Sequence, residues 1–84
     1  MNIYVGNLNY GVEDNDLQTL FEEFGSVQSS NVIVDKYNGR SKGFGFVTME
    51  NQDEASKAIK ELDGTTLDDR KIVVNEAKPK RDNY

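Results

Sequence analysis

Residues 42–49 read Lys-Gly-Phe-Gly-Phe-Val-Thr-Met, and this strand-length run decides how the rest of the chain is interpreted. Side chains of a strand point to alternate faces of a sheet, so Lys42, Phe44 and Phe46 share one face. Val47 falls on the opposite face, which we expect to be buried. The run therefore predicts a strand that carries two large aromatic rings beside a lysine.

Aromatic residues in a strand usually belong to the hydrophobic core, and that interpretation has to be weighed first. Here only Gly45 separates Phe44 and Phe46, and the other residues on their face are polar. Flat rings on an open face could stack on the bases of an unpaired nucleic acid strand, while the ammonium group of Lys42 could contact a phosphate. Core packing explains this arrangement less well than binding does.

Composition limits the chemistry that is available. The chain has 84 residues, enough for one small domain, and contains neither cysteine nor histidine. Disulfides, thiolate nucleophiles, tetrahedral zinc sites and the commonest general base are therefore missing, so we expect no catalytic residues, no metal and no cofactor. No apolar stretch could span a bilayer and no signal segment follows Met1, so a cytoplasmic protein without membrane contact is the simplest expectation. We also expect a monomer.

The formal net charge of -5 argues at first against a polyanionic partner, but the charges are unevenly distributed. Most acidic residues lie in or beside the two predicted helices described next. Apart from Lys57 and Lys60, the basic residues lie on predicted strands, loops and the tail: Lys36, Arg40, Lys42, Arg70, Lys71, Lys78, Lys80 and Arg81. We infer a dipolar molecule with acidic helices and a more basic opposite side.

Hydrophobic periodicity predicts six main elements. Leu17, Leu20, Phe21 and Phe24 follow the spacing of an amphipathic helix, and Gly25 is expected to take its C-terminal position. The predicted strands cover residues 2–6, 27–35, 42–49 and 71–75, and the predicted helices cover residues 13–24 and 52–62.

The second helix has a clear start and end. Asn51 is expected to cap it, with Glu54 completing a capping box, and Gly64 is expected to end it. The Asn38-Gly39 pair lies in the polar connection between the second and third strands, which should form a hairpin.

This β-α-β-β-α-β order predicts an α+β, ferredoxin-like fold: a four-stranded antiparallel sheet with both helices on one face. The residues expected under the helices are Ile3, Val5, Val32, Val47, Met49, Ile72 and Val74. Tyr4, Phe44 and Phe46 are then left on the open face, where an aromatic cluster needs an explanation.

The octamer at residues 42–49 and the hexamer Ile3-Tyr4-Val5-Gly6-Asn7-Leu8 together resemble the RNA recognition motif family. The octamer fits the family pattern at every restricted position except the last, where Met49 replaces an aromatic residue. Met49 should face the core, so this departure is expected to alter packing more than binding. The resemblance implies a domain over residues 1–77 followed by a short polar, basic tail at residues 78–84, and it is closest to small single-domain bacterial members of cyanobacterial type.

The resemblance also implies the roles of individual residues. Tyr4 and Phe46 would stack on adjacent bases, Phe44 would contact a sugar or base, and Lys42 would contact a phosphate. Further RNA contacts are expected from a set of positions on the last strand and the basic loops: Asn75, Glu76, Ala77, Lys71 and Arg40.

Several neighbouring residues receive plainer interpretations. Gly43 and Gly45 are expected to be structural and to allow close helix packing beneath the rings. Tyr10, in the loop before the first helix, is expected to be a packing residue. Tyr37, in the hairpin loop, is left open between packing and ligand contact.

The sequence thus predicts a non-catalytic domain that binds short single-stranded RNA, with single-stranded DNA as an alternative ligand. A second hypothesis is a protein-interaction domain of the same fold that uses the aromatic face, and the negative net charge is consistent with it. Enzymes of related topology such as acylphosphatase use an arginine in the loop after the first strand, but residues 7–11 contain none. Metal-carrying domains of this topology need a Cys-x-x-Cys loop, which is also missing.

Overall fold

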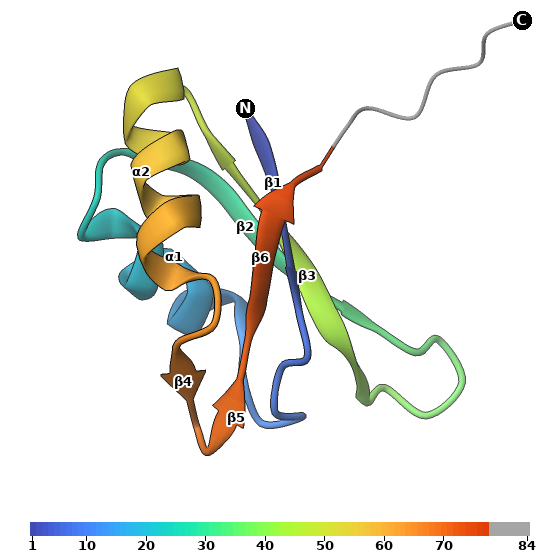
Figure 1. Cartoon of the computed structure of the whole chain (residues 1–84). Helices are drawn as coiled ribbons and strands as arrows, with labels where there is room; N and C mark the ends of the chain where they lie inside the picture. The colour runs from blue at the N-terminus through green and yellow to red at the C-terminus, as the bar shows by residue number, and fades with distance from the viewer. Residues whose placement is uncertain (78–84) are drawn as a thin grey trace, which may run out of the picture.

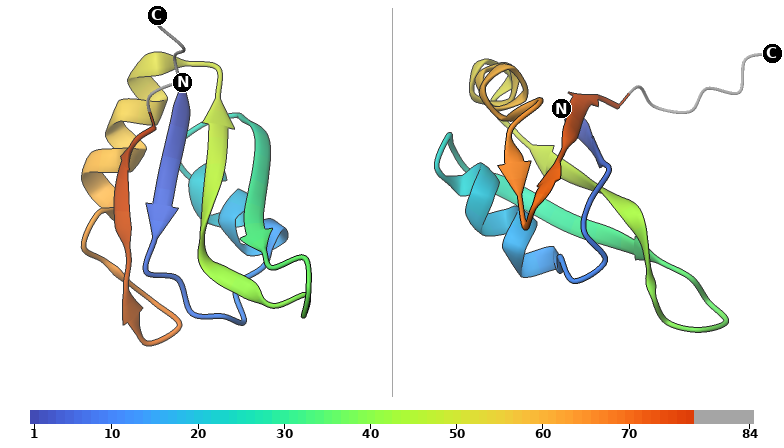
Figure 2. Two further views of the ribbon diagram at one scale, coloured as in Figure 1. Left: turned by 90° about the vertical axis from the view of Figure 1, so that its right-hand side faces the viewer. Right: turned by 60° about the horizontal axis from the view of Figure 1, so that its bottom comes forward.

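The computed structural model describes residues 1–77, and the tail predicted at residues 78–84 lies outside the described residues. Its four-stranded sheet has the order β2-β3-β1-β6 with every neighbouring pair antiparallel. Both helices cover the same face of this sheet (Figures 1 and 2). The elements are β1 (Asn2–Gly6), α1 (Asp14–Glu22), β2 (Val27–Val34), β3 (Ser41–Met49), α2 (Gln52–Leu62), β4 (Thr66–Leu67), β5 (Arg70–Lys71) and β6 (Val73–Glu76).

This architecture confirms the predicted fold, with one addition. The segment before the last strand forms a second, two-stranded sheet of β4 and β5, which the sequence pattern did not predict. β5 includes Lys71, which was predicted to begin the last strand, and β6 instead runs from Val73 to Glu76. The resulting hairpin lies below α2 and leads directly into β6 (Figure 1). None of the helices within residues 1–77 is both long enough and apolar enough to cross a membrane.

The core lies between the sheet and the two helices. Six of the seven residues predicted to be buried there are buried: Ile3, Val5, Val47, Met49, Ile72 and Val74. The seventh, Val32, is only partly buried because it lies on the edge strand β2 and packs against the core from its margin. Leu17 and Phe21 of α1 and Ala55 and Ala58 of α2 cover these strands from above.

The two helices differ in how closely they follow the sequence prediction. α2 has the predicted bounds: the Asn51 side chain accepts a hydrogen bond from the Glu54 N–H at 2.9 Å, and Gly64 follows the helix with a φ of 83°. α1 ends at Glu22, two residues before the predicted end.

The prediction that Gly25 occupies a left-handed C-terminal position is wrong. Its φ is not positive, so backbone conformation does not require a glycine here. The glycine is required by space instead, because a Cβ atom at Gly25 would overlap the side chain of Glu54. Gly25 therefore lets the chain after α1 approach the first turn of α2. The same residue type serves a different purpose from the one that the local pattern indicated.

The glycines of β3 also differ from the prediction that they allow close helix packing. A Cβ atom at Gly45 would collide with the carbonyl oxygen of Asn31 and would lie 3.0 Å from the Cα of Val32, both on the neighbouring strand β2. Gly43 has a φ of 85°, at the point where the β2–β3 register shifts. Both glycines are required by the sheet itself and not by the helices.

We expect Gly45→Ala to destabilise the domain by about 1 to 3 kcal/mol, because the added methyl group has to displace backbone atoms of β2. Chemical denaturation of the purified variant would measure the change. Gly11→Ala is the matched control, since the nearest atom to its added Cβ lies 3.6 Å away. The control should keep its stability or gain up to about 1 kcal/mol. Equal stability of the two variants would contradict the close strand approach.

Candidate nucleic-acid interface

Three aromatic rings form a cluster on the sheet face that the helices leave open. Tyr4 of β1 lies directly opposite Phe46 of β3 in the antiparallel register. The ring centroids of Tyr4, Phe44 and Phe46 are separated pairwise by 5.8 to 6.0 Å, within the range of favourable aromatic contacts. We call these three residues the platform.

The backbone beneath the platform is shaped to receive the rings. A Cβ atom at Gly6 would lie 2.8 Å from the Cζ and Cε2 atoms of Tyr4, so the tyrosine ring lies over the glycine along its own strand. Phe46 retains 37% of its surface exposed, and Tyr4 and Phe44 are half-buried. The rings therefore support one another while presenting apolar surface to solvent.

The last strand extends the platform on the side of Tyr4. In the β1–β6 register, Asn75 lies opposite Tyr4 and Val73 lies opposite Gly6. Side chains that are paired in this way share a face, so both residues belong to the open face. Val73 is 41% exposed there and was not predicted as a site residue, although its alternation with the buried Val74 was visible in the sequence.

Glu76 and Ala77 are placed differently from Asn75. Glu76 lies opposite Ile3, whose side chain is buried under the helices, so the carboxylate side chain projects from the helix side of the sheet. The N–H of Ala77 donates to the carbonyl oxygen of Asn2 at 2.8 Å and so continues the strand pairing. Glu76 can therefore reach a ligand on the open face only through its backbone, whereas the small Ala77 side chain returns to the open face.

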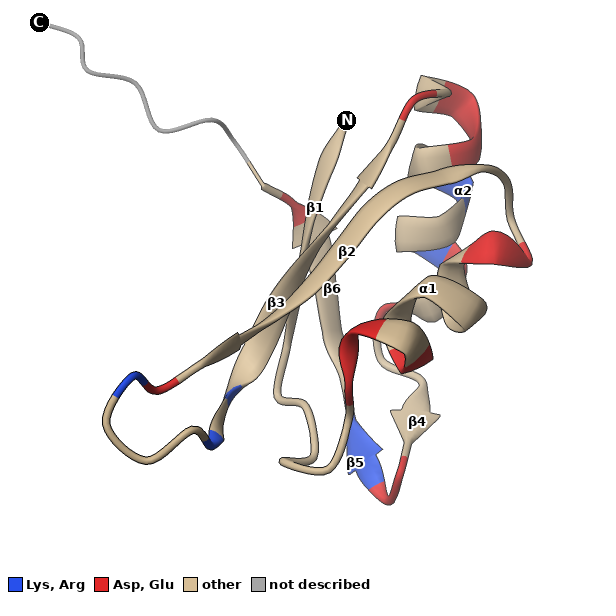
Figure 3. Ribbon diagram, turned by 180° about the vertical axis from the view of Figure 1, so that it is seen from behind, with Lys and Arg blue, Asp and Glu red and all other residues tan. Residues whose placement is uncertain are grey.

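The basic residues predicted to contact phosphate lie around one end of the open face. Lys42 and Arg40 are exposed and line a common hollow of about 480 Å³ with Phe44. Lys71 is exposed on β5. Figure 3 shows basic residues on β5 and on the β2–β3 hairpin, with acidic residues in the same hairpin and in the β4–β5 turn. Acidic residues gather on the helices and at their ends, although α2 also carries two lysines. The helices are thus mainly acidic, as predicted, but the opposite side carries charges of both signs.

A network at this end of the sheet involves residues that the sequence analysis did not select. Asn7 has a φ of 57°, and its side-chain N–H group donates to the carbonyl oxygen of Lys71 at 2.6 Å. Its side-chain oxygen accepts a hydrogen bond from the guanidinium of Arg70 at 2.8 Å. The loop after β1 is therefore joined to β5, and Arg70 is held beside the platform.

Tyr10 is a second residue whose role was predicted wrongly. It was expected to pack, yet 72% of its surface is exposed. Its exposure could have been expected from its position in a short loop, residues 7–11, which contains two asparagines and one glycine and whose only aliphatic residue is Leu8. Tyr37 is 99% exposed at the hairpin, which excludes packing within the domain for this residue.

Comparison with known proteins identifies the family. The family profile described as "RNA recognition motif" matches residues 3–73. The chain belongs to the RNA recognition motif family. Within residues 1–77, no group of three or more acidic residues could hold a metal ion, and members of this family are RNA-binding domains without catalytic activity.

The similar proteins include plant and bacterial ones. The chain is 52% identical to the chloroplastic RNA-binding protein CP29B of Arabidopsis thaliana over 98% of its length, but it spans only 29% of that protein. It is 46% identical to the putative RNA-binding protein RbpB of Nostoc sp., again over 98% of its length and over 80% of that protein. The chain thus spans less than a third of CP29B but most of the Nostoc protein.

Solved structures agree with the fold. The crystal structure of RNA binding protein PG1 superposes with a TM-score of 0.92 at 49% identity and covers 98% of this chain and 99% of that one. A Sex-lethal protein/RNA complex superposes with a TM-score of 0.89 at 29% identity, covering 95% of this chain and 48% of that one. The chain is thus an RNA recognition motif domain with exposed aromatic residues on its sheet.

The positive φ of Asn7 yields a prediction about stability. Asn7→Gly and Asn7→Ala both remove the two side-chain hydrogen bonds, but only alanine adds the strain of a left-handed backbone. We expect Asn7→Ala to be less stable than Asn7→Gly by about 1 kcal/mol in chemical denaturation. An alanine variant as stable as the glycine variant would show that the loop does not hold this conformation in solution.

Proposed function

We propose that this domain binds short single-stranded RNA on its open sheet face by stacking bases on the platform. The observation that carries the proposal is the contact of three rings on a face that no helix covers. Packing against the hydrophobic core could account for a single ring of this kind. Three partly exposed rings in mutual contact instead provide a surface for flat ligands. The structural similarity of the domain to a Sex-lethal protein/RNA complex supports the same proposal.

Each platform residue has a proposed role. Tyr4 and Phe46 stack on adjacent bases, and Phe44 contacts a sugar or a base. Lys42, exposed beside Phe44, contacts a phosphate, and the exposed cations of Arg40 and Lys71 add attraction for the RNA backbone.

The last strand is proposed to read base edges. Asn75 can do so with its side chain, because it lies beside Tyr4 on the open face. Its amide offers both donors and an acceptor. Glu76 and Ala77 contribute through backbone groups, since the Glu76 side chain projects from the other face.

The energetics favour modest affinity. A base stacked on an aromatic side chain contributes about 1 to 3 kcal/mol, so two stacks contribute about 2 to 6 kcal/mol. Micromolar affinity requires about 8 kcal/mol, and the remainder has to come from a few phosphate contacts. The acidic helices oppose contacts with a longer strand, so the salt dependence of binding should reflect only those few phosphates.

We still expect a cytoplasmic, monomeric protein, and the likeness to the Nostoc protein supports a cytoplasmic location.

We expect Tyr4→Ala and Phe46→Ala each to weaken RNA binding about fivefold to a hundredfold, because each removes one stacking surface. Fluorescence anisotropy with a short random-sequence RNA pool would measure the affinity. Phe46→Tyr, which keeps a flat ring, serves as the matched control and should bind within about twofold of the original domain. A folded Tyr4/Phe46 double alanine variant with undiminished affinity would exclude the platform as the binding surface.

An NMR titration with the same RNA pool should confine chemical-shift changes to the platform, Lys42 and β6. Shifts centred on α1 and α2 would overturn this placement. The protein-interaction hypothesis predicts a different outcome: a stoichiometric protein complex on the aromatic face that salt does not weaken and RNA does not displace. Parallel titration with single-stranded DNA would show whether the 2′-hydroxyl contributes to recognition.

A further inference from the structure

A hollow of about 270 Å³ opens at the end of the platform, where the loop after β1 meets β5. We call it the end pocket, and its lining residues are Tyr4, Asn7, Leu8, Tyr10, Lys42, Gly43, Phe44 and Arg70. We propose that the end pocket binds one further nucleotide of the RNA strand, with its phosphate on Arg70 and Lys42 and its base against Tyr10. The inference rests on the proposed function, since it extends the path of the same strand.

Arg70 is held in place before any ligand arrives. The Asn7 side chain donates to the Lys71 carbonyl oxygen at 2.6 Å, which fixes its amide so that the oxygen faces the guanidinium of Arg70 at 2.8 Å. One hydrogen bond leaves most of the guanidinium N–H groups free, and their planar fork matches the geometry of a phosphate. A cation that is already ordered loses less side-chain entropy on binding. Arg70 is thus better suited to a specific phosphate contact than a freely moving surface arginine.

Tyr10 is an exposed ring on an ordered loop. The Asn9 side chain accepts a hydrogen bond from Gly11 N–H at 2.9 Å and donates to the carbonyl oxygen of Asp68 at 3.1 Å, so it holds both sides of the loop. The Tyr10 ring lies beside Gly43, with its Cε1 atom 3.5 Å from the place that a Cβ atom would occupy. The loop therefore presents most of an aromatic ring to solvent without covering it.

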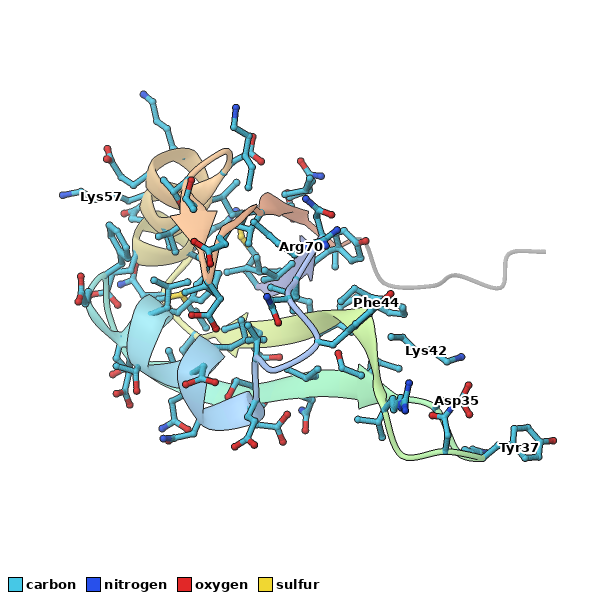
Figure 4. The ribbon with its side chains drawn as sticks, turned by 90° about the horizontal axis from the view of Figure 1, so that it is seen from below. Asp35, Tyr37, Lys42, Phe44, Lys57 and Arg70 are labelled. Carbon is cyan, nitrogen blue, oxygen red and sulfur yellow. The ribbon has the colours of Figure 1, made fainter. Side chains whose placement is uncertain are left out.

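The end pocket continues the platform directly. Tyr4 and Phe44 belong to both, so a strand that leaves these two rings enters the pocket at once. Figure 4 shows Arg70, Phe44 and Lys42 following one another along this end of the molecule, while Lys57 projects from the far side. The volume lies just below the range of sites that enclose whole small molecules, which fits one unit of a longer ligand.

Neighbouring acidic residues limit the reach of this site. Asp68 and Asp69 form the turn that precedes Arg70, with φ angles of 50° and 68°. Their negative charges lower the positive potential beyond Arg70. We therefore assign the end pocket one phosphate and not a longer stretch of backbone.

A length series of RNA tests the assignment. Random-sequence RNA pools of about two to seven nucleotides are titrated into the 84-residue chain, because the platform of this family holds two or three bases. The unaltered protein should gain roughly five- to twentyfold in affinity at the one added nucleotide that reaches the end pocket. Arg70→Gln and Tyr10→Ala should each reduce that gain to about twofold or less, while the shortest RNA that binds keeps its affinity. Lys57→Gln, on α2, is the charge-matched control and should retain the full gain.

The salt dependence gives a second readout. Arg70→Gln should lower the slope of log affinity against log salt by about 0.7 for the longer RNAs only, the value for one phosphate of a single strand. An unchanged gain in both variants would overturn the assignment, as would an equal loss of affinity for RNAs of every length, which would place Arg70 and Tyr10 on the platform itself. Failure of the unaltered protein to bind RNA of any length would instead refute the proposed function, and this inference with it.

Discussion

The antiparallel pairing of β1 with β3 is the constraint on which the rest of the molecule depends. Because Ile3 lies opposite Val47 and Tyr4 lies opposite Phe46, one register puts aliphatic pairs under the helices and aromatic pairs on the open face. A slip of one residue would exchange the two faces, exposing the core and burying the rings. Selection for a stable core and selection for a binding face therefore act on the same pairing, and neither can change without the other.

The glycines of β1 and β3 shape this sheet as much as its larger side chains do. Glycine leaves room for the Tyr4 ring at Gly6 and for the backbone of β2 at Gly45, and it allows the positive φ of Gly43 where the β2–β3 register shifts. Each of these positions lies next to a platform ring in sequence or in space. The open face can hold three large rings in contact because the strand backbone beneath and beside them approaches closely. The glycines of the octamer are thus part of the geometry of the aromatic face and do not merely loosen the strand.

The features that the sequence predicted correctly are those that follow from the local periodicity of its hydrophobic residues. The two helices, the four long strands, the buried aliphatic residues and the aromatic face all follow from repeats of two or of 3.6 residues. The features that were missed depend on contacts between distant parts of the chain. Asn7 meets Lys71 and Arg70 across 64 and 63 residues, and Gly25 faces Glu54 of the other helix.

One residue type can be required either by the local backbone conformation or by a contact with a distant residue. The sequence pattern alone does not distinguish these two cases. Gly64 ends a helix as its position indicated, whereas Gly25 is required by a neighbour that no local rule identifies. Tyr10 was expected to pack, but its loop is held by Asn9 and leaves the ring uncovered.

The net charge of -5 can be understood from the spatial arrangement of the charges. A duplex presents mainly phosphates to a protein and hides the flat faces of its bases. A domain with acidic helices and few exposed cations therefore gains little affinity from binding a duplex. An unpaired strand can lay its bases on the platform while only a few phosphates meet Lys42 and its neighbours. In the proposed binding mode, scarcity of positive charge would favour single strands over duplexes, because stacking would be the main source of affinity.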